Sequence, residues 1–240
     1  MLKSTITKQL AKIVGHNSIL TAKEDLATYA YDGTTTWSHP PDVVVLPTTT
    51  EQISAILKLA NENRIPVTPR GSGTNISGGS VPIRGGIVLC TTKMNRILEI
   101  NQTNLTATVE PGVVLQDFNS LLAKENLFYP PDPSSRGSCF LGGNLAECAG
   151  GPRAVKYGVT KDYVLGLEAV LPSGEIIRTG ARVLKNSTGY NLTQLLIGSE
   201  GTLGVITKII FRLLPYPRHN LLMLVPFTSA EKACEAVSAV

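Results

Sequence analysis

Residues 69–79, with the sequence Pro-Arg-Gly-Ser-Gly-Thr-Asn-Ile-Ser-Gly-Gly, combine residue types that bind phosphate. The four glycines of this loop allow positive φ angles and let a ligand approach the main chain closely. Several free N–H groups in such a loop form a concave anion site, and Arg70 adds a fixed positive charge. The pattern predicts a cradle for a phosphorylated cofactor; a flexible glycine loop without a ligand is the alternative.

Spacing excludes two familiar phosphate-binding loops. A Walker A loop ends in Gly-Lys-Ser or Gly-Lys-Thr, and the chain contains neither tripeptide. The dinucleotide fingerprint needs a third glycine three residues after the second, at the start of a helix. Ile76 occupies that position here, and Pro82 interrupts any helix that follows.

Two further segments rich in small residues favour a bound ligand. Residues 142–151 read GGNLAECAGG and follow the stiff turn 129–135, in which prolines fix φ. Residues 198–207 read GSEGTLGVIT. Three such loops on separate strands predict that main chain from several places approaches one flat ligand, with Cys148 of the second loop near it.

The elements that must position these loops form two lobes. In the first, a β-α-β unit places the phosphate loop at the carboxyl end of a strand, where α/β sheets commonly bind ligands. Thr48 and Glu51 form a capping-box pattern that opens the helix of this unit. The expected strands are 43–46, 66–68, 86–90, 97–100, 106–110, 164–171, 176–179 and 204–214, and the expected helices include an N-terminal one with Ile6, Leu10, Ile13 and Val14 on one face, one at 48–60 and one at 115–122.

The strings PRGSGTNISGG, YPPDPSS, GGNLAECAGGPRAVKYG, LPSGEI and GSEGTLGVIT occur in this order. Together they resemble the FAD-binding domain of the vanillyl-alcohol oxidase/PCMH flavoproteins, and most of all the group of the glycolate oxidase FAD subunit and D-lactate dehydrogenase. The resemblance covers roughly residues 40–217. It implies an α+β fold. An N-terminal helical segment at 1–38 would precede a two-lobed PCMH-type domain at 39–217. The two lobes would be α/β subdomains at about 39–95 and 96–217.

The resemblance also implies a set of cofactor-binding residues. Residues 70–75 would hold the FAD pyrophosphate, Pro131 and Asp132 would lie along the isoalloxazine and ribityl portion, and Gly204 and Ile206 would cover the adenosine. For Asp132 a turn cap, and for Ile206 an ordinary core position, are equally good interpretations. The full set is Pro69, Arg70, Gly71, Ser72, Gly73, Thr74, Asn75, Ser77, Pro131, Asp132, Gly142, Gly143, Ala146, Ala149, Gly151, Gly204 and Ile206.

Some members of the superfamily attach FAD through a histidine in the first loop. This chain has no histidine between His39 and His219, so we predict non-covalent FAD. The implied reaction is oxidation of a small-molecule 2-hydroxy acid to the 2-oxo acid, with hydride transfer to the flavin. Family members draw the substrate-binding and catalytic residues from a cap domain, so no catalytic residue is assigned; Arg153 and Tyr157 remain candidates for substrate contact or for packing.

Two alternatives remain open. One is a non-catalytic, FAD-binding electron-transfer subunit, and the other is a different oxidase on the same fold. In each case a partner subunit or an electron-acceptor protein is expected. Residues 218–240 are expected to begin a cap domain that is incomplete in this chain, with a strand at 221–227 and a capped helix from Thr228.

Composition excludes several other classes. The chain has 240 residues and a formal net charge of +4, with lysine and arginine scattered, so nucleic-acid binding has no support. Its four cysteines form no C-x-x-C pair and its three histidines lie far apart, so no metal site is predicted. No apolar run approaches the roughly 18 residues of a membrane span. We therefore expect no transmembrane segment and a cytoplasmic location. Peripheral association with a membrane is the alternative.

Overall fold

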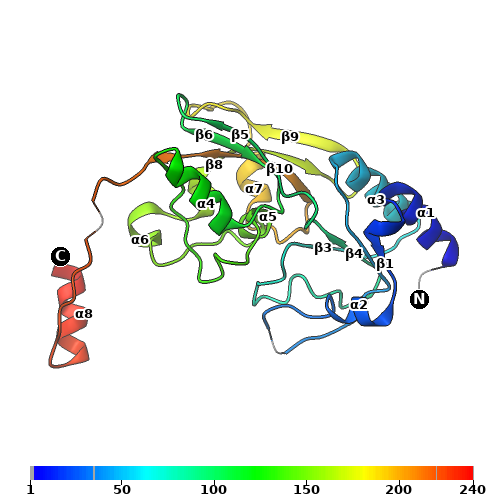
Figure 1. Cartoon of the computed structure of the whole chain (residues 1–240), viewed down its shortest axis with the longest axis horizontal. Coiled ribbons are helices and arrows are strands. Elements are labelled where there is room, and N and C mark those ends of the chain that lie inside the picture. The colour runs from blue at the N-terminus through cyan, green and yellow to red at the C-terminus, as the bar shows by residue number, and fades with distance from the viewer. Residues whose placement is uncertain (1–2, 35, 220, 240) are drawn as a thin grey trace.

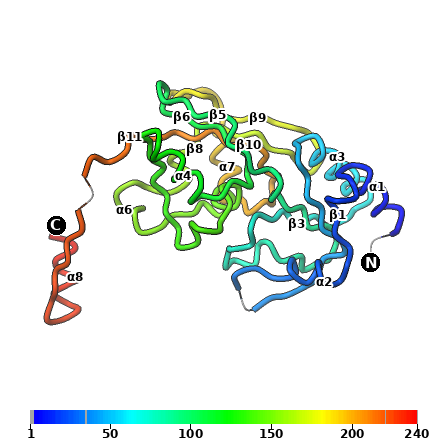
Figure 2. The backbone as a smooth tube through the Cα atoms, in the orientation of Figure 1, coloured from blue at the N-terminus to red at the C-terminus, as the bar shows by residue number. Residues whose placement is uncertain are grey.

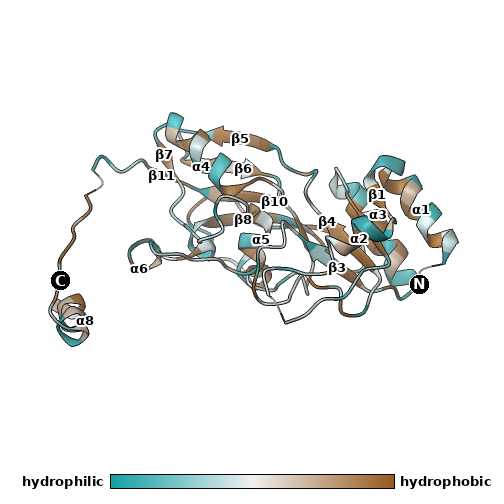
Figure 3. Cartoon of the chain, turned by 60° about the horizontal axis from the view of Figure 1, so that its bottom comes forward, coloured by the Kyte–Doolittle hydropathy of each residue, from teal (hydrophilic) through white to brown (hydrophobic). Residues whose placement is uncertain are grey.

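The computed structural model describes residues 3–34, 36–219 and 221–239. Two β-sheets lie side by side, and the C-terminal helix lies apart from both of them (Figures 1 and 2). The first sheet is built from residues 19–90 and the second from residues 97–212. The strands of both sheets are largely apolar in Figure 3, whereas polar residues occupy most of the turns.

The first sheet has the order β1(Ile19–Leu20)-β2(Val43–Val45)-β4(Ile87–Cys90)-β3(Val67–Arg70). β2, β4 and β3 run parallel, and the short β1, which the sequence pattern did not reveal, pairs antiparallel with β2. Helices α1(Ser4–Val14) and α3(Thr50–Glu62) cover one face, and α2(Lys23–Ala27) lies on the other. Burial on both faces explains why β2 and β4 consist of Val, Ile, Leu and Cys without polar alternation.

Helix α3 begins close to the predicted position, but its cap differs from the expected one. Thr49, not Thr48, is the N-cap, and its hydroxyl accepts a hydrogen bond from the Gln52 main-chain N–H at 3.2 Å. The Gln52 side chain reaches back to accept from the Thr48 N–H at 2.8 Å. The apolar face then follows as predicted, with Ile53 and Ile56 fully buried.

The second sheet is antiparallel, in the order β5(Ile97–Asn101)-β6(Thr106–Val109)-β10(Val205–Arg212)-β8(Val164–Val170)-β9(Ile176–Gly180). Helices α4(Leu115–Lys124), α5(Leu141–Ala146) and α7(Leu192–Leu196) contribute to the apolar core on its inner face. The rings of Phe118, Tyr129 and Phe211 pack together at the centre of this core, with centroids 4.7 to 5.8 Å apart. The remaining elements are α6(Ala154–Tyr157), two 3-10 turns (His16–Ser18 and Thr160–Tyr163), and the strand pair β7(Leu127–Phe128)-β11(Leu214–Pro215).

Helix α3 connects the two sheets. The Thr50 hydroxyl donates to Glu168 of β8 at 3.0 Å, and the Ser54 hydroxyl donates to the Gly174 carbonyl in the β8–β9 turn at 2.5 Å. Glu168 also pairs with Lys208 at 2.8 Å and with Arg178 at 3.0 Å. Burial alone would raise the pKa of Glu168, but the hydrogen bonds from Lys208, Thr50 and Arg178 outweigh it and lower that pKa.

The segment after β11 departs from the sequence prediction. Leu221 to Phe227 do not form a strand: they are exposed and pair with no other described segment. Only a neighbouring strand could satisfy their main-chain groups in a sheet, and none lies beside them. Helix α8(Ala230–Ala239) follows and has no buried residue. The predicted helix therefore forms, while the predicted strand is wrong.

Candidate functional site

A continuous groove lies between the phosphate loop of the first lobe and helix α5 of the second. It consists of three adjoining cavities of about 290, 70 and 230 Å³, all of which are lined by Pro69. The first two cavities share Gly143, and the second and third share Gly204. Together they fall within the roughly 300–1,000 Å³ that is typical of ligand pockets.

The phosphate loop presents main-chain donors to the largest of these three groove cavities. Gly71 to Ile76 line it, directly after the last residue of β3. Among the described residues, no main-chain N–H from Gly71 to Ser77 donates a hydrogen bond to another part of the protein. Such a run of N–H groups without partners can bind an anion, because each can donate to a phosphate oxygen.

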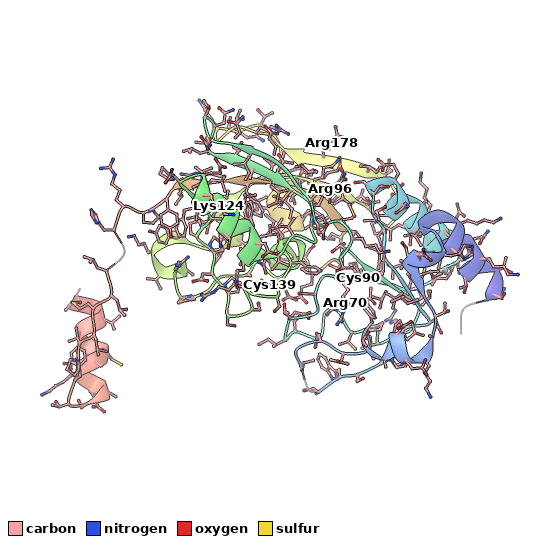
Figure 4. All side chains as sticks on the ribbon, in the orientation of Figure 1. Arg70, Cys90, Arg96, Lys124, Cys139 and Arg178 are labelled. Atoms are coloured by element: carbon pink, nitrogen blue, oxygen red, sulfur yellow. The ribbon has the colours of Figure 1, made fainter. Side chains whose placement is uncertain are left out.

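Arg70 lies beneath this loop, with its guanidinium against Gly73, and it lines the adjoining 70 Å³ cavity but not the 290 Å³ one. Only 7% of the residue is exposed, and Nη1 donates to the Tyr31 carbonyl at 2.8 Å. Its guanidinium stacks on the Tyr29 ring, 5.5 Å from the centroid, and lies close to Cys90 (Figure 4). Burial lowers the pKa of Arg70, an effect that nearby Asp32 opposes. Arg70 therefore supports the loop and supplies charge from below.

Helix α5 brings the second glycine segment to the groove. A Cβ on Gly143 would meet no atom within 4 Å, because Gly143 faces open space. A Cβ on Gly142, in contrast, would lie 2.5 Å from the Pro111 Cβ. Gly143 thus leaves room for a ligand, whereas Gly142 allows the helix to pack against Pro111.

Thirteen of the seventeen predicted site residues line the groove, and four do not. Ser77 donates from its hydroxyl to Glu147 at 2.8 Å. Asp132 is buried and pairs with Arg136 at 3.0 Å and Arg153 at 3.4 Å. Gly151, at φ +130°, lets the chain pass against the Asp132 carbonyl. Pro131 is buried beside Asp132. These contacts fit packing and turn roles better than direct ligand contact.

Several residues of the groove were absent from the predicted set. Asn144 lines the largest cavity and is only 4% exposed, and its Nδ2 has no hydrogen-bond partner among the described residues. Glu147 and Glu200 line it as well. Burial raises the pKa of Glu147, and the negative charges of Glu200 and Asp32 raise it further. All three lie inside the quoted strings, but their orientation toward the groove depends on the tertiary structure. Ser80, Ser134, Ser135, Cys139 and Phe140 also line it.

The site suits an elongated ligand with an anionic group. It offers N–H donors at the loop that have no partner among the described residues, a backbone surface without side chains at Gly143, and apolar walls from Leu57, Ile65 and Val205 at the far end. The described residues contain no group of three or more His, Cys, Asp or Glu side chains placed to hold a metal ion. None of the described helices is long and apolar enough to cross a membrane.

Comparison with known proteins agrees with this geometry. The family model described as an FAD binding domain matches residues 41–180. The chain is 45% identical over 238 residues to the glycolate oxidase subunit GlcD of Bacillus subtilis, covering 99% of this chain and 51% of that protein. It is 46% identical over 197 residues to a D-lactate dehydrogenase of Anaerostipes hadrus, covering 82% of this chain and 41% of that protein.

Solved structures show the same fold. An alkyldihydroxyacetonephosphate synthase superimposes with a TM-score of 0.81 at 25% identity, covering 91% of this chain and 42% of the other. The chain spans about half the length of the curated relatives it matches.

Proposed function

Because the chain belongs to the FAD-binding-domain family, with FAD as its cofactor, we propose that it is the FAD-binding part of an enzyme that oxidises a 2-hydroxy acid to the 2-oxo acid. The relatives named above act, by their names, on glycolate and D-lactate, which are both 2-hydroxy acids. The observation that carries the proposal is the continuous groove between the two lobes, lined by the loop with its unpaired N–H groups and by Gly143.

The residues of the groove fit FAD. The N–H groups of residues 71–75 are the donors that a pyrophosphate requires, and the charge of Arg70 beneath them adds to the attraction. Gly143 leaves space where a side chain would obstruct a flat ring system. The buried Asn144 amide lacks a partner that a ligand can supply. Gly204 and Ile206 form an apolar wall of the adjoining middle cavity.

When bound, FAD would accept two electrons, in the form of the hydride from C2 of the hydroxy acid, while a base would take the hydroxyl proton. The role we assign to this chain is to bind and orient the cofactor and to exclude water from one of its faces. The groove presents no histidine or lysine among its lining residues. Its charged lining residues are the carboxylates Glu147 and Glu200 and Arg70, whose guanidinium is already held by the Tyr31 carbonyl. In keeping with the cap domain that the resemblance implies, we propose that the general base and the group that binds the substrate carboxylate lie outside this set.

The experiment is a reduction assay without oxygen. Because the base and the carboxylate-binding group are proposed to lie outside the groove lining, the complete gene product is used, together with any partner chain that copurifies. It is loaded with FAD, and the visible flavin absorption is followed after addition of glycolate, D-lactate or D-2-hydroxyglutarate, with 3-hydroxybutyrate as the matched control. Bleaching by a 2-hydroxy acid alone supports the proposal. A protein that binds FAD but is reduced only by dithionite contradicts it and favours an electron-transfer subunit. The name of the GlcD relative, a subunit, is the reason to propose a partner chain as well.

We further propose that FAD is held without a covalent bond, because no histidine lines the groove. Acid precipitation should release all of the yellow chromophore into the supernatant. Colour that stays with the pellet would contradict non-covalent attachment and leave the proposed reaction untouched.

A further inference from the structure

A segment outside the part matched by the family model lies against the phosphate loop. Residues 29–34 and 36–39, here called the brace, precede residue 41, where the match begins. The brace contacts the loop through main chain and side chain. Its Tyr31 carbonyl accepts from Arg70 Nη1 at 2.8 Å, and its Gly33 N–H donates to the Asn75 carbonyl at 2.8 Å.

Asp32 is the centre of this contact. It is 6% exposed, and its Oδ2 accepts a hydrogen bond from Asn75 Nδ2 at 2.6 Å. Its Oδ1 accepts from the Thr34 N–H at 2.8 Å, which holds the carboxylate in place. Asn75 Oδ1 in turn accepts from the Ser80 hydroxyl at 2.6 Å. One carboxylate of the brace therefore fixes an amide that spans the phosphate loop.

The brace and the loop also fit each other closely in shape. A Cβ on Gly33 would lie 2.8 Å from the Asn75 carbonyl oxygen, so a side chain there would push the loop away. A Cβ on Gly78, at φ +78°, would meet the ring of Trp37. Glycine on each side of the contact thus permits an approach that another residue would prevent.

The phosphate loop needs such support because it has little of its own. Its N–H groups from Gly71 to Ser77 make no hydrogen bond within the described protein, and glycine loses more conformational entropy on ordering than any other residue. A ligand that had to order a loose loop would lose affinity, whereas a loop fixed beforehand avoids that cost.

We propose that Asp32 is a positioning residue for the cofactor, which acts through Asn75 to hold the phosphate loop in the conformation that binds the pyrophosphate. The unit that binds FAD then begins at the brace, upstream of residue 41. The inference rests on the proposed function in one respect, namely that FAD is the ligand of the groove. It assigns a role in that site to a residue that does not line the three cavities.

The test separates position from charge with two substitutions of Asp32. Asp32→Asn loses the charge and keeps one oxygen, which can accept from Asn75 while the bond from the Thr34 N–H is lost, so FAD affinity should fall by only about 3-fold. Asp32→Glu keeps the charge but adds a methylene at a buried position, where overpacking displaces its neighbours. We expect about 10- to 100-fold weaker FAD binding for Asp32→Glu and for Asp32→Ala, because each disrupts the bond that ties the Asn75 amide to the brace and leaves its Nδ2 only the bond to the Ser77 hydroxyl at 3.1 Å within the loop itself. Asp117→Ala, at an exposed position of α4, is the control.

Two signals are measured on each variant. The dissociation constant comes from the quenching of flavin fluorescence, at a temperature where thermal melts show every variant folded. Trp37, the only tryptophan of the chain, reports whether the brace stays docked, and its emission should shift in Asp32→Glu and Asp32→Ala but not in Asp32→Asn.

Each outcome decides between the claims. Wild-type affinity in Asp32→Ala overturns the positioning role, and weak binding in Asp32→Asn combined with wild-type affinity in Asp32→Glu shows that charge, not position, matters. A wild-type protein that binds no FAD overturns the proposed function itself. Wild-type binding combined with unaffected Asp32 variants overturns only the inference about the brace.

Discussion

The substitution Gly143→Ala should move stability and cofactor binding in opposite directions. Gly143 lies within α5(Leu141–Ala146), where a Cβ would meet no atom within 4 Å. On the facing side of the groove, a Cβ on Gly71 would lie 3.9 Å from the Gly143 Cα. The two lobes thus come together here through two glycines, and we propose that the ligand occupies the space in front of Gly143.

The magnitudes follow from these two facts. Replacing glycine by alanine inside a helix gains about 1 kcal/mol, since alanine has less conformational entropy to lose. For a chain of this size that gain raises the melting temperature of the apo-protein by about 2–4 °C. A methyl group forced into an occupied, close-packed space costs about 1–3 kcal/mol. The dissociation constant for FAD should therefore rise by about 5- to 150-fold.

Gly142→Ala is the matched control, one residue away in the same helix. Its Cβ would lie 2.5 Å from the Pro111 Cβ and 3.1 Å from the Pro111 carbonyl oxygen, so this variant should melt below wild type. Thermal melts of the apo-proteins and FAD titrations by fluorescence quenching measure both quantities. Wild-type FAD affinity in Gly143→Ala would refute the reasoning that the cofactor passes this point, and a lower melting temperature would refute the open space in front of it.

Three further outcomes are expected. Glu168→Gln removes the charge that Lys208 and Arg178 pair with and should lower the free energy of unfolding by about 1–3 kcal/mol at pH 7. Because the folded-state pKa of Glu168 is lowered, its contribution to stability is present above the ordinary value of 4.5 and is lost as pH falls through the lowered pKa. Urea melts of variant and wild type should therefore converge in strong acid. Gly151→Ala forces a side chain at φ +130° against the Asp132 carbonyl, so its melting temperature should fall. Gly189→Ala is the control: nothing lies within 4 Å of its Cβ, so its melting temperature should fall less, by the backbone strain of the positive φ alone. Glu147 has a raised pKa and lines the cavity in which we propose that the pyrophosphate binds. FAD should therefore bind less tightly as pH rises through that pKa and Glu147 becomes negatively charged. Titrations across pH should show this dependence in wild type and a weaker one in Glu147→Gln.

Local patterns in the sequence were enough to predict much of the fold. The β-α-β unit around α3, the hairpin of β8 and β9, and the N-terminal helix all form close to their predicted positions. Each has a periodic apolar face or a turn signal within a few residues, and such signals depend on neighbours in the chain. The strand expected at 221–227 does not form, because a strand also needs a neighbouring strand to pair with, and local residues do not specify that partner.

The candidate site divides in the same way. The glycine loops and a phosphorylated cofactor could be predicted from the residues themselves, because a phosphate cradle is a local property of the main chain. FAD as that cofactor came from the resemblance to a known family. The orientation of each side chain was not. Only the tertiary structure turns Arg70 toward Tyr31, brings Asp32 against Asn75 and distinguishes Gly143 from Gly142. These contacts join residues far apart in sequence, and close packing between lobes decides them.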